Sequence, residues 1–225
     1  MNTGAALNNW FTKTKTAGDS VNNEEIIRKK ISQKKPGPED HYNLFSVFLP
    51  LVEVDKQLHV LFEVRAENLD EQPGEICFPG GRIEKGETPL ESAVRETLEE
   101  LRISHNQVRI FGPLNYIITP YNIIIYPFAG RLIDVDVNKI NFNRDEVSEV
   151  FTVPLEYLLR HKPQVYFVDV RNEPRRDFPF SLIRNGKNYR WKTGSYPVLF
   201  YTYGRHTIWG LTARILKIFL DTISS

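Results

Sequence analysis

The 225-residue chain has little cysteine, no long apolar segment and almost no net charge. Its single cysteine, Cys77, excludes an intramolecular disulfide framework, and we expect it to be a buried small side chain. No segment approaches the roughly 20 apolar residues that span a bilayer. The N-terminus lacks the apolar stretch of a secretory signal, and residues 222–225 are not a peroxisomal signal. We therefore expect a cytoplasmic protein with no membrane partner.

The formal net charge of +1 gives no global reason to expect a nucleic-acid partner, although a local basic patch is compatible with it. The apolar share of 41% and the charged share of 25% are ordinary for a soluble globular protein. Residues 1–40 are predicted to form an N-terminal arm with a short helix at Val21–Gln33, which Pro36 ends. Residues 41–225 are predicted to form one domain.

The pattern of apolar residues from Leu44 onward predicts strands first and then alternating helices and strands. A capping box, Thr88 with Glu91, predicts the start of a helix that ends at Leu101. This order predicts an α/β (α+β) fold, a mixed β-sheet between helical layers. The expected strands are Leu44–Val54, Leu58–Val64, Glu75–Phe78, Val108–Thr119, Ile123–Ile133, Gln164–Val170, Asn188–Trp191 and Val198–Tyr203, and further helices are expected at Pro154–Leu159 and Ile208–Ile223.

The chemistry is expected within Phe78–Ile103. On its helix, Glu96, Glu99 and Glu100 share one face, where like charges repel one another. A hard divalent cation would remove that conflict, whereas a solvated acidic face is the alternative interpretation. Gly80-Gly81 would let the backbone approach a ligand closely.

A positively charged side chain, Arg95, is also expected within the acidic cluster. Arg95 lies eight residues after Glu87 and is predicted to pair with it, fixing the loop against the helix. Together with the carboxylates and the glycines, this pair favours a metal ion held against a phosphate-bearing substrate.

Seven positions fit the pattern G-x5-E-x7-R-E-U-x-E-E-x-G-U, where U is aliphatic, and the chain therefore resembles the Nudix hydrolases. Two positions depart from the pattern: Thr97 replaces an aliphatic residue, and Arg102 replaces the final glycine. The positions that match are Gly81, Glu87, Arg95, Glu96, Glu99, Glu100 and Ile103.

The Nudix resemblance implies Mg²⁺- or Mn²⁺-dependent hydrolysis of a nucleoside diphosphate linked to another moiety. It also implies an α/β/α sandwich with a loop-helix-loop site and a C-terminal helix. Glu96, Glu99 and Glu100 become the metal ligands, Glu99 and Glu100 also taking catalytic roles, and Arg95 orients the carboxylates. Glu146 or Glu149 becomes the general base; a capping role before the Pro154 helix is the alternative for both.

The residues before this motif resemble those of the coenzyme A pyrophosphatase subfamily, because Arg65, Ala66, Gly74 and Phe78-Pro79-Gly80-Gly81 match in register. This resemblance implies cleavage of coenzyme A or acyl-CoA to 3′,5′-ADP and 4′-phosphopantetheine or its acyl derivative. Arg65, Gly80 and Gly81 are then the substrate-binding residues.

Three residues depart from the subfamily motif. Phe62 and Glu63 replace Leu and Thr, and Asp70 stands where the motif has its second Arg. Asp70 keeps a second substrate class open, namely ADP-ribose or another nucleoside diphosphate derivative. A nucleotide-sensing module without activity is the third alternative, which the intact carboxylates oppose. Trp209 is expected to be a packing residue, and a homodimer stays open.

Overall fold

The computed structural model describes residues 23–34, 37–39 and 41–224, and the chain divides into two compact units, Met1–His41 and Tyr42–Ser225. In the first unit, helix α2 (Asn23–Ser32) has Glu24 and Glu25 in its first turn and two lysines in its last. These charges complement the helix dipole. The first two residues of the predicted helix and the rest of the predicted arm before it lie outside the described residues.

The centre of the second unit is strand β1 (Asn43–Val54), which reads as a near-continuous apolar run and is buried at half of its residues. β1 pairs antiparallel with β2 (Gln57–Arg65) and β4 (Gly80–Arg82), and parallel with β7 (Ile123–Leu132). Asp55 and Lys56 connect β1 to β2 with positive φ angles of 50° and 64°, as a two-residue hairpin turn requires.

Shorter strands extend this sheet on both sides. Among the described residues it has eight strands and is mixed, as predicted. The outer strands are β3 (Ile76–Cys77) and β8 (Val147–Pro154) beside β2, and β5 (Val108–Pro113) and β6 (Ile117–Ile118) beside β7.

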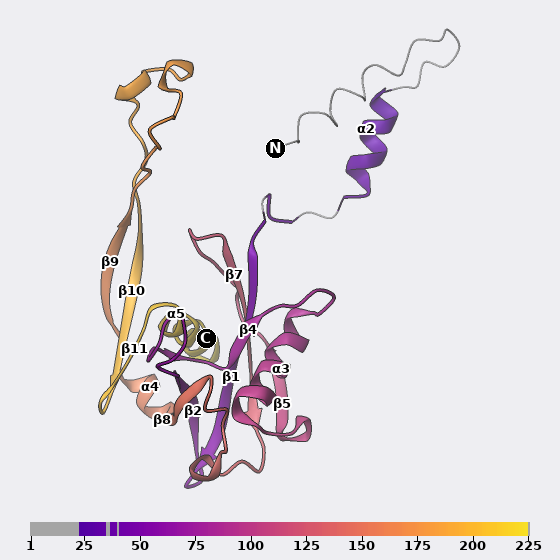
Figure 1. Ribbon diagram of the computed structural model, residues 1–225. Helices are drawn as coiled ribbons and strands as arrows, with labels where there is room; N and C mark the ends of the chain where they lie inside the picture. Colours follow the sequence, from indigo (N-terminus) through magenta and orange to yellow (C-terminus); the bar gives the residue numbers. More distant parts are fainter. Residues whose placement is uncertain (1–22, 35–36, 40, 225) are drawn as a thin grey trace. The chain divides into compact units, whose positions relative to one another are not determined.

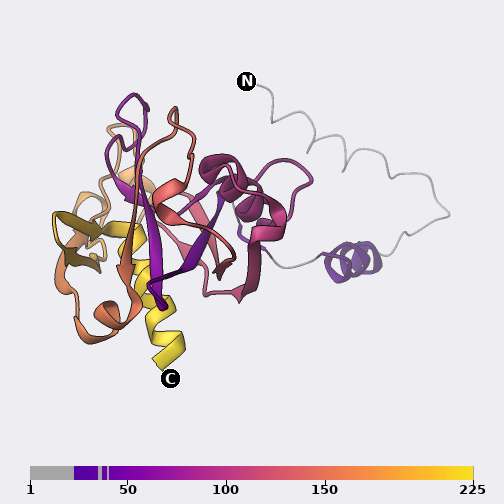
Figure 2. The ribbon, with the colours of Figure 1, turned by 90° about the horizontal axis from the view of Figure 1, so that it is seen from below.

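Helices cover both faces of the sheet (Figures 1 and 2). α3 (Pro89–Leu101) packs Ala93 and Leu101 against Phe48, Leu61 and Leu132 on one face. On the other face, α4 (Leu155–Arg160) and α5 (Gly210–Ser224) pack against Leu49, Val60 and Phe62. Successive residues of a strand point to opposite faces, so β1 and β2 contribute to both cores. The predicted sandwich with a C-terminal helix is confirmed.

A second, three-stranded sheet has the order β11-β10-β9 and consists of β9 (Gln164–Val170), β10 (Gly194–Tyr203) and β11 (His206–Trp209). β10 and β11 contribute Leu199, Tyr201 and Ile208 to the core around α5. All seven residues of β9 are exposed, and Phe167 is 71% exposed. In Figure 1, β9 and β10 form a long ribbon. Single turns of 3₁₀-helix lie at His105–Gln107, Val137–Lys139, Phe180–Leu182 and Gly186–Asn188.

Four details differ from the predicted elements. The predicted strand Val108–Thr119 is two strands, because the register shifts after Ile110 and Pro113 has no N–H to continue the ladder. The predicted strand Asn188–Trp191 is wrong: it begins in a 3₁₀ turn and continues without regular structure. Ile208 and Trp209 belong to β11, and helix α5 begins after them at Gly210. Strand β8 was not predicted.

No helix in the described ranges is long and apolar enough to cross a membrane.

Candidate active site

Helix α3 begins with the predicted capping box. The Thr88 Oγ1 accepts a hydrogen bond from the Glu91 backbone N–H at 3.3 Å, and the Glu91 carboxylate accepts one from the Thr88 N–H at 2.8 Å. Pro89 occupies the first turn, where no N–H is needed. The apolar side of α3 is buried against the sheet, which fixes the direction of its carboxylates.

The two departures from the motif are both accommodated. Thr97 is fully buried, and its hydroxyl donates to the Ala93 carbonyl at 2.7 Å, so the polar group has a partner. Arg102 ends the helix in the left-handed conformation, with φ 49° and ψ 45°. A glycine would adopt that conformation without strain.

Arg95 binds three carboxylates, one in the loop before α3 and two on the helix. Its Nε and Nη2 donate to the two Glu87 oxygens at 2.9 and 3.2 Å, a bidentate pair. Its Nη1 donates to Glu96 at 2.9 Å and to Glu99 at 3.2 Å. Glu87 also accepts the Glu84 backbone N–H at 3.0 Å. These hydrogen bonds, with that of Arg95 foremost, hold the pKa of Glu87 below its usual value. The predicted Arg95–Glu87 pair is confirmed.

Gly80 and Gly81 form part of a strand, not the free loop suggested by the sequence. The Gly80 N–H donates to the Glu100 carboxylate at 2.9 Å. A Cβ added at Gly81 would lie 2.2 Å from the Glu96 Oε1, and one at Gly80 would lie 2.3 Å from the Ser46 carbonyl oxygen. Both glycines are therefore required for the close approach of β4 to the carboxylates and to β1.

Burial and mutual repulsion act on these carboxylates. Desolvation, followed by the charges of Glu96 and Glu146, raises the pKa of Glu100 to about 8, although the Gly80 N–H opposes the shift. Desolvation also raises the pKa of Glu96, against the effect of Arg95. Such an excess of negative charge in a half-buried position favours a hard cation with oxygen ligands.

The donor set fits Mg²⁺ or Mn²⁺, since every candidate ligand is a carboxylate oxygen. In the described part of the chain, no three acidic, histidine or cysteine side chains already form a group that could hold a metal ion. Glu96 and Glu99 are instead turned toward Arg95.

A cleft of about 290 Å³ lies beside this cluster. The three predicted substrate-binding residues, Arg65, Gly80 and Gly81, all line it, together with Trp209 and Leu211. The Arg65 Nε donates to the Glu71 carbonyl at 3.1 Å. Asp70 is exposed and is not among the lining residues. Trp209, expected to be a packing residue, is 43% exposed and stacks on Phe200 at a ring-centroid distance of 5.9 Å.

The structure separates the two acids proposed as general base. Glu149 is opposite Val64 in the β2–β8 register, and it accepts hydrogen bonds from Arg205 at 2.7 Å and lies 3.2 Å from His206. Its neighbour on the same side of β8, Phe151, stacks on His206 within the core of the α5 face. Glu149 is therefore not brought to the Glu96–Glu100 cluster. Glu146 lies close enough to the cluster for its charge to raise the pKa of Glu63, Glu96 and Glu100.

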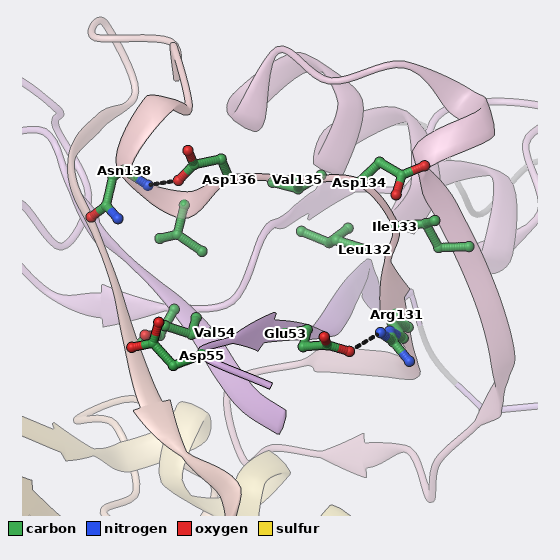
Figure 3. Close-up of a pocket in the computed structure, with 12 residues that line it drawn as sticks. Glu53, Val54, Asp55, Arg131, Leu132, Ile133, Asp134, Val135, Asp136 and Asn138 are labelled. Carbon is green, nitrogen blue, oxygen red and sulfur yellow. Dashed lines mark hydrogen bonds and ion pairs between the residues drawn. The ribbon is translucent and has the colours of Figure 1, made fainter. Parts of the chain in front are cut away.

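A second acidic pocket, of about 540 Å³, lies where β1 and β7 end (Figure 3). Its acids include Glu53, which pairs with Arg131 at 2.6 Å, and Asp136, which accepts the Asn138 N–H at 3.1 Å. Glu53 lies on β1 six residues after Val47, the partner of Gly80. This pocket is thus separate from the α3 carboxylates.

Residues 44–169 match the model of the NUDIX domain. The chain belongs to the Nudix hydrolases. Nudix hydrolase 3 of Caenorhabditis elegans is 33% identical over 185 residues, which cover 79% of this chain and 72% of the relative. The mouse peroxisomal coenzyme A diphosphatase NUDT7 is 38% identical over 138 residues, which cover 60% and 56%.

A further relative and a solved structure are also similar to this chain. The human mitochondrial coenzyme A diphosphatase NUDT8 is 28% identical over 181 residues, covering 80% of this chain and 69% of the relative. A crystal structure of a MutT/nudix family protein from Enterococcus faecalis superposes with a TM-score of 0.52 at 16% identity, covering 100% of this chain and 76% of that one, and supports the Nudix fold. The chain is thus a member of the Nudix pyrophosphohydrolase family with coenzyme A diphosphatases among its relatives.

A further buried acid, Glu63, was not among the predicted site residues. Glu63 is fully buried on β2, and desolvation, followed by the charges of Glu100 and Glu146, raises its pKa well above the usual value. The signal in the sequence is a carboxylate inside a predicted strand (Leu58–Val64) whose only other polar residue is His59.

Proposed function

We propose that this Nudix hydrolase is a divalent-metal-dependent diphosphatase that cleaves coenzyme A or acyl-CoA to 3′,5′-ADP and 4′-phosphopantetheine or its acyl derivative. The observation that carries the proposal is that Arg65, Gly80 and Gly81, the residues that resemble the coenzyme A motif, line one cleft. The same two glycines contact the carboxylates of Glu96 and Glu100. The relatives named as coenzyme A diphosphatases support the same substrate.

In this proposal, Glu96, Glu99 and Glu100 hold Mg²⁺ or Mn²⁺. When bound, the cation would neutralise the diphosphate and lower the pKa of a water molecule. Glu96 and Glu99 would turn from Arg95 toward the ion, and the bidentate bond to Glu87 would keep Arg95 in place while they do so. Arg65, at the cleft wall, would bind a phosphate group of the substrate.

Glu146 is proposed as the group that accepts a proton from the attacking water. It lies in the connection before β8 and interacts with the acids of the cluster, whereas Glu149 is held by Arg205 and His206. The backbone carbonyl of Glu146 accepts the Ala66 N–H at 2.9 Å, which links the Glu146 segment to the segment that follows Arg65.

The second candidate function is hydrolysis of ADP-ribose or another nucleoside diphosphate derivative. It is favoured by Asp70, an acid in place of the motif's second Arg. Because Asp70 is exposed and outside the cleft lining, its charge does not face the position proposed for the diphosphate. This geometry is compatible with a coenzyme A substrate.

A substrate panel tests the proposal. Coenzyme A, acetyl-CoA, a medium-chain acyl-CoA, ADP-ribose, NADH, a dinucleoside polyphosphate and ATP would each be incubated with the protein and Mg²⁺ or Mn²⁺, and the products identified by mass spectrometry. We expect 3′,5′-ADP from coenzyme A or its thioesters, with kcat/KM above that for the other compounds. Faster cleavage of ADP-ribose would replace the proposal with the second candidate, and nucleotide binding without any cleavage would favour a sensing module.

A further inference from the structure

Glu63 has an environment that a buried carboxylate does not ordinarily tolerate. It is 0% exposed, and neither of its carboxylate oxygens has a hydrogen-bond partner. An unpaired polar group in the interior destabilises the folded state, and an unpaired charge destabilises it more. The residue therefore requires either a proton or a partner that is absent from the protein itself.

The strand pattern shows where Glu63 points. Leu61, two residues earlier on β2, packs in the core beneath α3 with Ala93 and Leu101, and residues two apart on a strand share a face. Glu63 thus approaches the Glu100 end of α3 from the sheet. In agreement, the charged groups that act on it are Glu100, Glu146 and Arg65.

The neighbours of Glu63 provide no compensation. Its cross-strand partner on β3 is Cys77, and burial raises the pKa of that thiol, so it carries no positive charge and stays protonated. Arg65 is the one cation among the groups that act on Glu63, and its Nε is already used by the Glu71 carbonyl. Three carboxylates, those of Glu63, Glu100 and Glu146, therefore share a single guanidinium, that of Arg65.

From this geometry we infer that Glu63 is an additional carboxylate of the divalent-metal site, completing from the sheet side the set that α3 presents with Glu96 and Glu100. The inference rests on the metal site of the proposed function. It also gives a reason for the departure from the coenzyme A motif, in which Thr stands at this position. A carboxylate adds a negative charge and a strong oxygen ligand for a hard cation, whereas a threonine hydroxyl is neutral.

The test measures Mn²⁺ binding to the protein without substrate, by electron paramagnetic resonance and by isothermal titration calorimetry. Glu63→Gln keeps the shape of the side chain, and Glu63→Thr introduces the residue of the motif. We expect both to weaken Mn²⁺ binding by about 10- to 100-fold, the range typical when a metal ligand loses its support. Without metal, the melting temperature of Glu63→Gln should equal or exceed that of the wild type, because a neutral amide replaces a group that would be a buried, unpaired charge when ionised.

The matched control is Glu53→Gln. Glu53 lies on the adjacent strand β1, its side chain is 51% exposed, and it already has Arg131 as a partner. Mn²⁺ affinity should stay within about twofold of the wild type in this variant, as for a surface charge remote from the site.

The outcomes separate this inference from the proposed function. A folded Glu63→Gln protein with wild-type Mn²⁺ affinity, while Glu96→Gln and Glu100→Gln lose binding, would overturn the role of Glu63 and leave the α3 metal site standing. If Glu96→Gln and Glu100→Gln also bind Mn²⁺ normally, the metal site of the proposed function is wrong. A substrate other than coenzyme A would change the proposed substrate and not the Mn²⁺ result.

Discussion

The Arg95 guanidinium donates hydrogen bonds to both carboxylate oxygens of Glu87, eight residues earlier, and its remaining nitrogen donates to Glu96 and Glu99. Arg95 thus connects the loop before α3 to two carboxylates of the helix. Its own charge is stabilised by these contacts, with the Glu87 hydrogen bond foremost, and its pKa is raised.

Replacing Arg95 with Lys should lower kcat while leaving the fold intact. An ammonium group is a point charge and cannot bind Glu87 in a bidentate manner while also reaching Glu96. We expect a loss of about 10- to 100-fold, as for residues that orient metal ligands. Steady-state kinetics check the loss, and Arg131→Lys, at the single contact with Glu53 shown in Figure 3, is the control that should stay near wild type. Equal activities for the two variants would contradict the role of Arg95.

Gly81→Ala should displace the Glu96 carboxylate, because the new Cβ would lie 2.2 Å from its Oε1. Since that carboxylate is the far end of a flexible side chain, the helix can stay in place while the ligand moves. A misplacement of about 1 Å can cost on the order of 100-fold in rate. Activity and thermal melting should be measured together, with Gly194→Ala, where the added Cβ lies 3.9 Å from Val170, as the control. Melting that collapses in step with activity would indicate a folding defect instead.

Glu100→Gln should abolish most activity without unfolding the protein. The amide keeps the size of the side chain and can still accept the Gly80 N–H, but it removes a negative charge from the proposed metal site. We expect kcat to fall by on the order of 100-fold or more, beyond the effect of losing an orienting residue. Circular dichroism checks the fold. Near-normal turnover would refute the metal assignment of Glu100.

The metal-free protein should lose stability as the pH rises from about 5 to 8. Burial, together with neighbouring acids, raises the pKa of Glu100 from 4.5 to about 8, and that of Glu63 rises in the same direction. Between these values the folded state binds more protons than the unfolded state, so the free energy of unfolding falls with pH, by up to about 1.4 kcal/mol per pH unit for each group.

Urea unfolding in a metal chelator, at half-unit pH steps, measures this slope. Glu100→Gln should flatten it, and saturating Mg²⁺ should restore stability at pH 8, because a bound cation stabilises the ionised carboxylates. Stability that rises with pH over this interval in the wild type would be the opposite of the expected sign.

Arg102→Gly should stabilise the protein by roughly 0.5–1 kcal/mol, since the left-handed conformation at the end of α3 has a φ of 49° and strains any residue with a Cβ. The substitution also loses the exposed hydrogen bond from Arg102 Nη2 to Asn143 Oδ1 at 3.1 Å. Arg102→Ala loses the same hydrogen bond but keeps the Cβ. This variant therefore separates the effect of the lost bond from that of the relieved strain. The prediction fails if chemical denaturation ranks the alanine variant equal to the glycine variant.

Much of the architecture could be predicted from the sequence because its signals are local. The Thr88–Glu91 capping box marks the start of α3, and the apolar run of β1 identifies the centre of the sheet. Strand β8 could not be found in this way, because Ser148, Glu149 and Thr152 interrupt its apolar residues without a regular alternation and its place is fixed by pairing with β2, far away in the sequence. The same is true of Trp209, which pairs as a strand with Phe200 although its neighbours have helical spacing.

The site followed a similar division. The Arg95–Glu87 pair depends on residues eight apart and could be read from their spacing, whereas the positions of Glu63 and Glu149 depend on strand register. A shift of one residue in the pairing of a strand would turn its side chains to the opposite face of the sheet. The acid on that strand would then lie on the other side of the sheet. Sequence spacing alone therefore does not show that Glu63 approaches Glu100 and that Glu149 does not.

The parallel pairing of β1 with β7 has a consequence for how the chain folds. Residues 43–51 pair with residues 123–131, and α3 lies in the connection between them. Helix α3 can form early from local contacts, but closing so long a connection costs conformational entropy before any pairing repays it. During synthesis, α3 would therefore emerge before β7, and the pairing at the centre of the sheet could form only after β7 had been made. We expect the joining of β7 to β1, and of β8 to β2 across a still longer stretch of chain, to follow the formation of α3.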